Sequence, residues 1–254
     1  MSHGDELNSK GFTVFPFDDA ILEWVTHAAT LAPAILADPA HEKWWRHGRS
    51  WFVGVDALPN DASGRIPGGP ALQGHIIDFI ARHLGFAGPW HRGQLSVCFP
   101  GYPLRDPHET DGQHNFRLKR DAAHVDGLHA EGNDRRRHLR EAHQFILGLP
   151  LNVTETDSAP LTIWEGSQLI MARMFDAVLA GVPAANHGEI DFTTAYHEAR
   201  QQCFATCRRT IVHARPGSAY IIHRHALHGV APWALPSSRE QSRIIAYFRP
   251  LIDK

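Results

Sequence analysis

The chain has 254 residues, of which 43% are hydrophobic and 20% charged, with a formal net charge of −2. These values are ordinary for a globular domain with one substantial core, and they favour neither a nucleic acid nor an anionic membrane as a partner. Three cysteines are too few for a disulfide framework, and no apolar run indicates a signal peptide or a membrane span. We therefore expect a cytoplasmic protein; nothing indicates its oligomeric state.

The first third of the chain predicts helices joined by loops. Residues 18–36 carry apolar side chains near the 3.6-residue period of a helix, and either Asp18 or Asp19 can cap its N-terminus. Residues 73–84 repeat this pattern. We therefore expect an N-terminal helical part over residues 1–93.

From about residue 94 the pattern changes to short apolar runs bounded by Gly, Pro and Asp. These runs predict strands at 94–99, 122–125, 144–153, 161–164, 210–214, 219–223 and 243–249. Short strands separated by turns favour an antiparallel barrel or jelly roll over a parallel sheet. We expect a single mainly β domain with helices (α+β) over 1–254, with its core at 94–250 and a helical insertion at about 168–209.

The segment His124-Val125-Asp126 places two metal-ligand side chains at positions i and i+2. Alternate residues of a strand point to one face, so both side chains could reach one metal. An imidazole with a carboxylate suits Fe(II) better than structural zinc. However, a chain with 19 histidines contains roughly one His-x-Asp by chance, and His3-Gly4-Asp5 is another. The motif therefore needs support from elsewhere in the chain.

That support comes from the segment Gly217-Ser-Ala-Tyr-Ile-Ile-His-Arg-His-Ala-Leu-His-Gly229. It resembles the distal metal-ligand strand of the phytanoyl-CoA hydroxylase-like family of Fe(II)/2-oxoglutarate-dependent oxygenases. In this register His228 stands at the distal iron ligand and Gly229 at its glycine partner. His223 stands where the family usually has an aspartate, which is a departure from the pattern.

Two further segments resemble the same family in the same order. Residues 160–168 look like its strand and turn ending in Pro-Gly-Ser-His, with Glu165 for the proline and Gln168 for the histidine. Residues 242–249 look like its last strand, which brings in a cosubstrate-binding arginine. The resemblance covers roughly residues 94–250.

The resemblance implies a double-stranded β-helix (jelly-roll, cupin-like) core that holds Fe(II) through His124, Asp126 and His228. The remaining metal positions would take 2-oxoglutarate and O2. Family halogenases replace the carboxylate ligand with a small residue, so the presence of Asp126 implies hydroxylation or a related oxidation. An arginine should bind the distal carboxylate of 2-oxoglutarate. Arg239 has the common family spacing of +11 from His228, whereas Arg243 at +15 lies on the predicted strand, which favours it.

Other polar and aromatic residues have structural interpretations beside functional ones. His223 and His225 are more readily explained as buried or supporting residues than as ligands. The basic run 135–137 with Arg140 indicates a solvated face, with a lid that contacts an acidic substrate as the alternative. The aromatic side chains that either line a pocket or pack in the core are Tyr102, Phe116 and Trp164.

We expect a dioxygenase that hydroxylates a small-molecule or carrier-bound metabolite and releases succinate and CO2. One alternative is a cupin-like barrel that binds a metal without turnover; another is a protein hydroxylase of the same fold. The arginines after His228 argue against the first, because a binding protein has no need to hold a dicarboxylate. Nothing in the sequence identifies the substrate.

Overall fold

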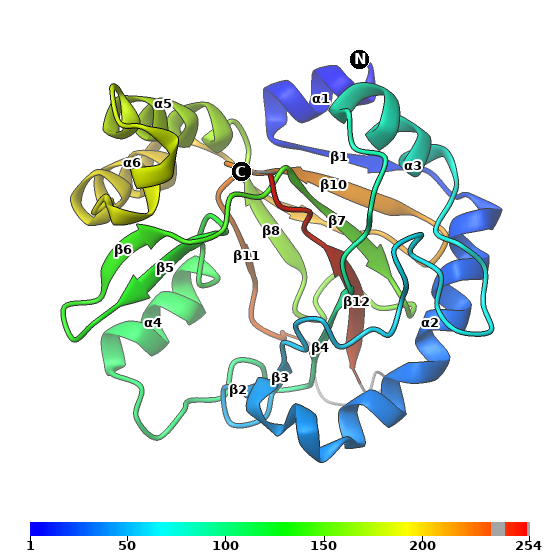
Figure 1. Cartoon of the computed structure of the whole chain (residues 1–254). Helices are drawn as coiled ribbons and strands as arrows, with labels where there is room; N and C mark the ends of the chain where they lie inside the picture. Colours follow the sequence, from blue (N-terminus) through cyan, green and yellow to red (C-terminus); the bar gives the residue numbers. More distant parts are fainter. Residues whose placement is uncertain (235–241, 253–254) are drawn as a thin grey trace.

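The structure is a computed structural model that describes residues 1–234 and 242–252 (Figure 1). Its centre is a seven-stranded antiparallel sheet with the order β1-β10-β7-β12-β4-β3-β2. The strands are β1 (Phe12–Phe15), β2 (Trp45–Arg46), β3 (Trp51–Phe52), β4 (Gln94–Cys98), β7 (Phe145–Pro150), β10 (Ala219–His223) and β12 (Arg243–Phe248).

A second, three-stranded sheet has the order β11-β8-β9. Its strands are β8 (Leu161–Trp164), β9 (Arg209–Val212) and β11 (His228–Val230). Inward side chains of the two sheets form one buried hydrophobic cluster, to which Ile146, Tyr220 and Ile245 contribute from one sheet and Leu161 and Ile163 from the other. Two sheets that share such a core make a sandwich whose interior can hold a ligand at one end.

Helices cover the outer face of the large sheet. They are α1 (His3–Lys10), α2 (Asp19–Ala37), the 3-10 helix Pro39–Trp44, α3 (His75–Phe79) and the π-helical turn Ile80–Leu84. Asp18 caps α2 by accepting a hydrogen bond from the amide of Ala20 at 2.9 Å. Contrary to our expectation from the sequence, α2 is long and apolar enough to span a membrane. One face of it, however, packs into the largest hydrophobic cluster, beside Leu147 and Phe248 of the sheet.

The remaining elements lie on the other side of the molecule from α2 and α3 (Figure 1). They are α4 (Asp111–Arg120), the hairpin β5 (Leu128–Glu131) and β6 (Arg136–Leu139), α5 (Ser167–Leu179), the 3-10 helix Ala184–Glu189 and α6 (Thr193–Thr206). Helices α5 and α6 are the predicted insertion, and their apolar faces form a separate cluster that includes Phe175 and Tyr196.

The mainly β core with a helical insertion is confirmed, and β8 and β10 have the predicted bounds. The prediction of a strand at 122–125 is wrong, because His124 forms only an isolated bridge there. Residues 1–93 also contribute more than helices, since β1, β2 and β3 all join the large sheet.

Candidate metal centre

His124 and His228 are 104 residues apart in sequence and are held together by their own backbones. The amide of His124 donates to the carbonyl of His228 at 2.8 Å, and the amide of His228 donates to the carbonyl of His124 at 3.0 Å. His228 also begins β11, where it pairs with Ile163 of β8. This reciprocal pair fixes the spacing of the two imidazoles, whose ring centroids are 4.8 Å apart.

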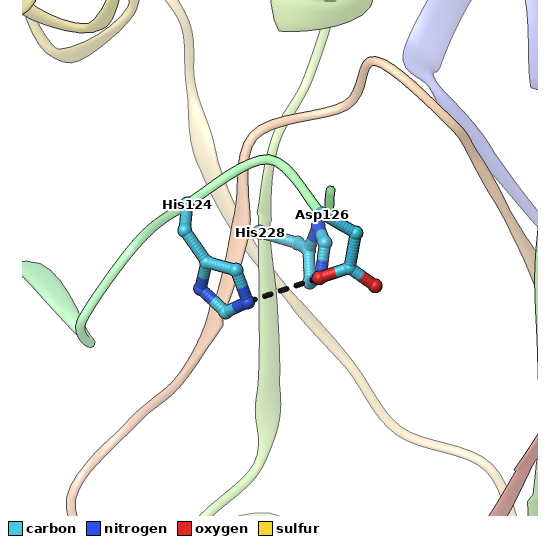
Figure 2. Close-up of side chains that lie close together, drawn as sticks. All are labelled: His124, Asp126 and His228. Atoms are coloured by element: carbon cyan, nitrogen blue, oxygen red, sulfur yellow. Dashed lines mark ion pairs between the residues drawn. The ribbon is translucent and has the colours of Figure 1, made fainter. Parts of the chain in front are cut away.

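Asp126 completes a compact group of three donor side chains (Figure 2). Its Oδ1 lies 3.2 Å from Nε2 of His124 and 3.7 Å from Nε2 of His228. One donor atom from each residue can be chosen so that all three lie within 4.8 Å of one another. The side chains of Asp126 and His228 are about one-tenth exposed, and that of His124 is 45% exposed. The group is therefore open on one side.

Both imidazoles have the tautomer that a metal requires. Nδ1 of His124 is 3.0 Å from the carbonyl oxygen of Ala122, and Nδ1 of His228 is 3.0 Å from that of Ala226. A carbonyl only accepts, so each Nδ1 carries the proton and donates it. Both Nε2 atoms then carry lone pairs directed at the group.

The charge states also suit a cation. Burial opposes ionisation of Asp126, but the Arg249 guanidinium holds its pKa well below the usual value. Burial lowers the pKa of His228 to about 4, only partly offset by Asp126. Near neutral pH the group is thus one carboxylate with a neutral His228. Two imidazole nitrogens and one carboxylate oxygen with an open side fit a mononuclear Fe(II) site.

Asp126 reaches the group through a turn, not through strand alternation. His124 is a bridge residue, and Asp126 and Gly127 form a turn before β5 begins. Gly127 has φ +87°, and a Cβ there would lie 1.8 Å from the carbonyl oxygen of Glu141. Only glycine can take this position, so the turn that orients Asp126 is fixed by the close passage of another chain segment.

Gly229 has a similar reason to be glycine. A Cβ at this position would lie 2.2 Å from the carbonyl oxygen of Asp121, which accepts a hydrogen bond from the amide of Val230 at 3.0 Å. The segment before His124 therefore packs directly on the backbone after His228. The His-Gly pair of the sequence thus has a packing explanation in this chain.

Gly229→Ala should lower the free energy of unfolding by about 1–3 kcal/mol, because the added methyl must push the Asp121 backbone away. It should also weaken metal binding by moving His228. Thermal unfolding with and without metal measures both effects. Gly4→Ala is the control, since its Cβ would meet nothing closer than Ser2 Oγ at 3.8 Å in a helix; an equal loss in both variants would contradict the packing explanation.

Arg249 is a site residue that the sequence analysis did not single out. Its Nη1 donates to Oδ2 of Asp126 at 3.3 Å, on the side away from the two histidines. Arg249 follows β12, six residues after Arg243, and alternate residues of a strand share a face. In the predicted strand 243–249, this alternation places Arg249 on the same face as Arg243 and could have indicated a role at the site.

Arg249→Met should reduce the affinity for Fe(II) by about 10- to 100-fold, since Asp126 would lose the partner that orients its carboxylate. Metal titration under anaerobic conditions measures the change. Arg208→Met is the matched control, because Arg208 forms an exposed ion pair with Glu165 at 2.8 Å. Wild-type affinity in Arg249→Met would show that the contact does not support the site.

The structure describes one of the two arginines that the sequence offers for binding 2-oxoglutarate. Arg239 lies outside the described residues. Arg243 is 5% exposed and begins β12 opposite Cys98. Its side chain lies beside the hydroxyls of Tyr220 and Tyr247, which hydrogen-bond to each other at 2.9 Å. Its Nη1 is buried without a hydrogen-bond partner. It borders a small void of about 10 Å³ and does not line the larger cavity beside His124 and Asp126.

The other residues considered from the sequence do not join the triad. Nδ1 of His223 accepts from the amide of His225, and the His225 ring stacks on Phe175 with centroids 4.8 Å apart. Among the described residues the triad is the one group of metal-ligand side chains found at this spacing. Trp164 packs in the cluster under the insertion, whereas Tyr102 and Phe116 line the cavity.

His124 and Asp126 of the triad line a cavity of about 640 Å³. Its walls come mainly from the loop of residues 121–127 (the metal loop), α4, the β5–β6 hairpin and α6. The lining includes Trp51, Tyr102, Phe116, Arg137, Arg200 and Arg249. A cavity of this size is in the range of small-molecule sites.

No protein-family profile matches the chain, and no curated protein matches it. Solved structures do match. The non-heme alpha ketoglutarate dependent carbocyclase SnoK from nogalamycin biosynthesis superposes with a TM-score of 0.58 at 14% identity, over 98% of this chain and 84% of that one. EctD from S. alaskensis with bound Fe gives 0.51 at 14% identity, over 97% and 74%. The chain therefore has the jelly-roll fold of these non-heme, 2-oxoglutarate-dependent enzymes.

Proposed function

We propose that the chain is an Fe(II)/2-oxoglutarate-dependent dioxygenase that hydroxylates a small-molecule or carrier-bound metabolite, with release of succinate and CO2. The observation that carries this proposal is the triad, in which both Nε2 lone pairs and an ionised carboxylate converge at the mouth of a cavity. The jelly-roll fold supports it, and the cavity volume favours a small substrate.

In the proposed reaction His124, Asp126 and His228 would hold Fe(II), and 2-oxoglutarate and O2 would bind beside them. Iron and 2-oxoglutarate supply the oxidising chemistry when bound. The chain fixes the ligand geometry: the two backbone carbonyls hold the imidazoles, and Arg249 holds the carboxylate.

Arg243 is the proposed partner of the distal carboxylate of 2-oxoglutarate. A buried guanidinium is costly without an anion, and no carboxylate within residues 1–234 and 242–252 pairs with Arg243. Its unpartnered Nη1 and the neighbouring tyrosine hydroxyls make a ready carboxylate site. Arg239 remains the alternative.

The proposed function is tested by succinate release from 2-oxoglutarate in the presence of Fe(II), O2 and ascorbate. Uncoupled turnover, even without the substrate, is expected from the wild-type chain and should be absent from Asp126→Ala. Metal binding with neither turnover nor 2-oxoglutarate affinity would instead support a non-catalytic barrel. Turnover that only peptides stimulate would support a protein hydroxylase.

A cytoplasmic location is part of the proposal. All three cysteines are free, and Cys98 and Cys203 are buried. Free thiols and Fe(II) both suit a reducing compartment. Fractionation of the source cells checks this.

A further inference from the structure

The cavity lined by His124 and Asp126 is rich in arginine. Five guanidiniums line it, from Arg117, Arg135, Arg137, Arg200 and Arg249. The acidic residues in the same lining are Asp121, Asp126 and Glu141. The whole chain is slightly acidic, with a net charge of −2, so this concentration of positive charge is local to the cavity.

Several of these charges are already paired. Arg249 contacts Asp126 at 3.3 Å, and Arg117 contacts Glu109 at 2.5 Å. Asp121 accepts from Arg209 at 2.5 Å, outside the lining, and Glu141 pairs with His143 at 3.1 Å. Arg135, Arg137 and Arg200 are left, and in the described segments no carboxylate lies within ion-pair distance of any of them. The lining therefore keeps uncompensated positive charge.

Arg137 and Arg200 both lie over the same aromatic ring. Their guanidinium carbons lie 5.7 Å and 5.2 Å from the ring centroid of Tyr196, and that of Arg200 is also 4.7 Å from the ring of Phe116. Stacking of this kind orients a guanidinium while leaving N–H groups at its edge for a ligand. Burial and the nearby Arg200 and Arg135 lower the pKa of Arg137, as expected for crowded like charges.

These two arginines lie on elements that are fixed to each other and to the metal loop. The backbone amide of Arg137 donates to Oγ1 of Thr193 at 2.8 Å, and the amide of Phe192 donates to the Arg137 carbonyl at 2.8 Å. The hydroxyl of buried Tyr196 lies near the backbone of Val125, between two of the triad residues. The positions of both guanidiniums are thus tied to the triad.

We propose that Arg137 and Arg200 form a subsite that binds an anionic group of the substrate, a carboxylate or a phosphate, while the substrate occupies the cavity beside the triad. Two preoriented guanidiniums without protein carboxylates match the planar or tetrahedral oxygens of such a group. This inference rests on the proposed function and adds a substrate class to it. It also gives the basic run 135–137 a role beyond a solvated face.

The test uses three aromatic probes of similar size, since the cavity also contains Trp51, Tyr102 and Phe116. Phenyl phosphate, benzoate and neutral benzamide are titrated calorimetrically into the full chain, anaerobically with Fe(II) and 2-oxoglutarate, and in parallel without either. We expect the anions to bind, benzamide not to bind, and the anion affinity to fall as salt is added. The tighter anion identifies the group as phosphate or carboxylate.

Arg137→Gln and Arg200→Gln should each lower the affinity for that anion by about tenfold or more, the usual loss for a charge-assisted hydrogen bond. Arg140→Gln is the matched control, because Arg140 lies just after β6 but pairs with Glu131 at 2.5 Å; it should bind as wild type. If Arg137→Gln unfolds through loss of its 3.0 Å bond to the Leu128 carbonyl, Arg200→Gln still decides the question.

Equal binding of benzamide and the anions, or wild-type anion affinity in the folded arginine variants, overturns the subsite. Loss of 2-oxoglutarate affinity alone in these variants also overturns it, by assigning the pair to the cosubstrate. Failure of the proposed function gives a different result: the wild-type chain makes no succinate, while anion binding still depends on Arg137 and Arg200.

Discussion

Asp126→Ala is expected to abolish 2-oxoglutarate turnover and to reduce the affinity for Fe(II) by more than about 100-fold. The exchange removes the one anionic ligand of the triad and leaves the Arg249 guanidinium unpaired beside the metal position. A partner that only orients a ligand contributes about 10- to 100-fold in affinity, so loss of the ligand itself should exceed that. Anaerobic Fe(II) titration and the succinate assay measure the two effects.

His124→Ala and His228→Ala should give comparable losses, whereas His223→Ala is the matched control. His223 is a partly buried histidine on β10 that lies outside the triad. Circular dichroism verifies that each variant folds. Full activity in both His124→Ala and Asp126→Ala would rule out the triad.

Arg243→Met is expected to raise the KM for 2-oxoglutarate by about 100-fold with a smaller effect on kcat. Two charge-assisted hydrogen bonds to one carboxylate contribute about 3 kcal/mol, and each 1.4 kcal/mol is tenfold in affinity. Methionine keeps an unbranched apolar side chain of similar length, so the variant should fill the buried position beside Tyr220. Succinate formation at varied 2-oxoglutarate concentration measures KM and kcat separately.

Arg243→Lys should recover part of the affinity, since it restores the charge but not the two-pronged geometry. Arg239→Ala is the decisive comparison, because both arginines follow His228 at usable spacings. A larger increase in KM from Arg239→Ala than from Arg243→Met would transfer the cosubstrate role to Arg239.

The sequence predicted the parts of the fold in which burial imposes a period. Helix α2 and strands β8 and β10 have strong apolar patterns because they border the large cores, and they were placed within one or two residues. The β5–β6 hairpin was missed because it carries few apolar side chains and packs on α6, not on the sandwich. Strand β11 is three residues long and gives too little pattern to recognise.

The triad could be predicted from motif and order, but not its geometry. The motif His124-x-Asp126 suggested a strand. In the structure the two side chains are positioned by the backbone bridge from His124 to His228 and by the turn at Gly127. Both features depend on contacts between distant segments. Local secondary-structure propensity cannot predict a contact between residues 104 positions apart. The arginine pair at 137 and 200 was hidden for the same reason, since only the packing of the hairpin on α6 brings the two together.

The reciprocal bridge between His124 and His228 also has a consequence for folding. It closes a loop of 104 residues that contains β5 to β10 and the helical insertion. Closing a loop costs conformational entropy that grows with the logarithm of its length, so this contact should form late and cooperatively. The unfolded chain can then offer no assembled triad. A metal that binds only the folded chain stabilises it by about 2.7 kcal/mol at a free concentration of 100 times Kd. The free energy of unfolding should therefore rise with the concentration of available metal.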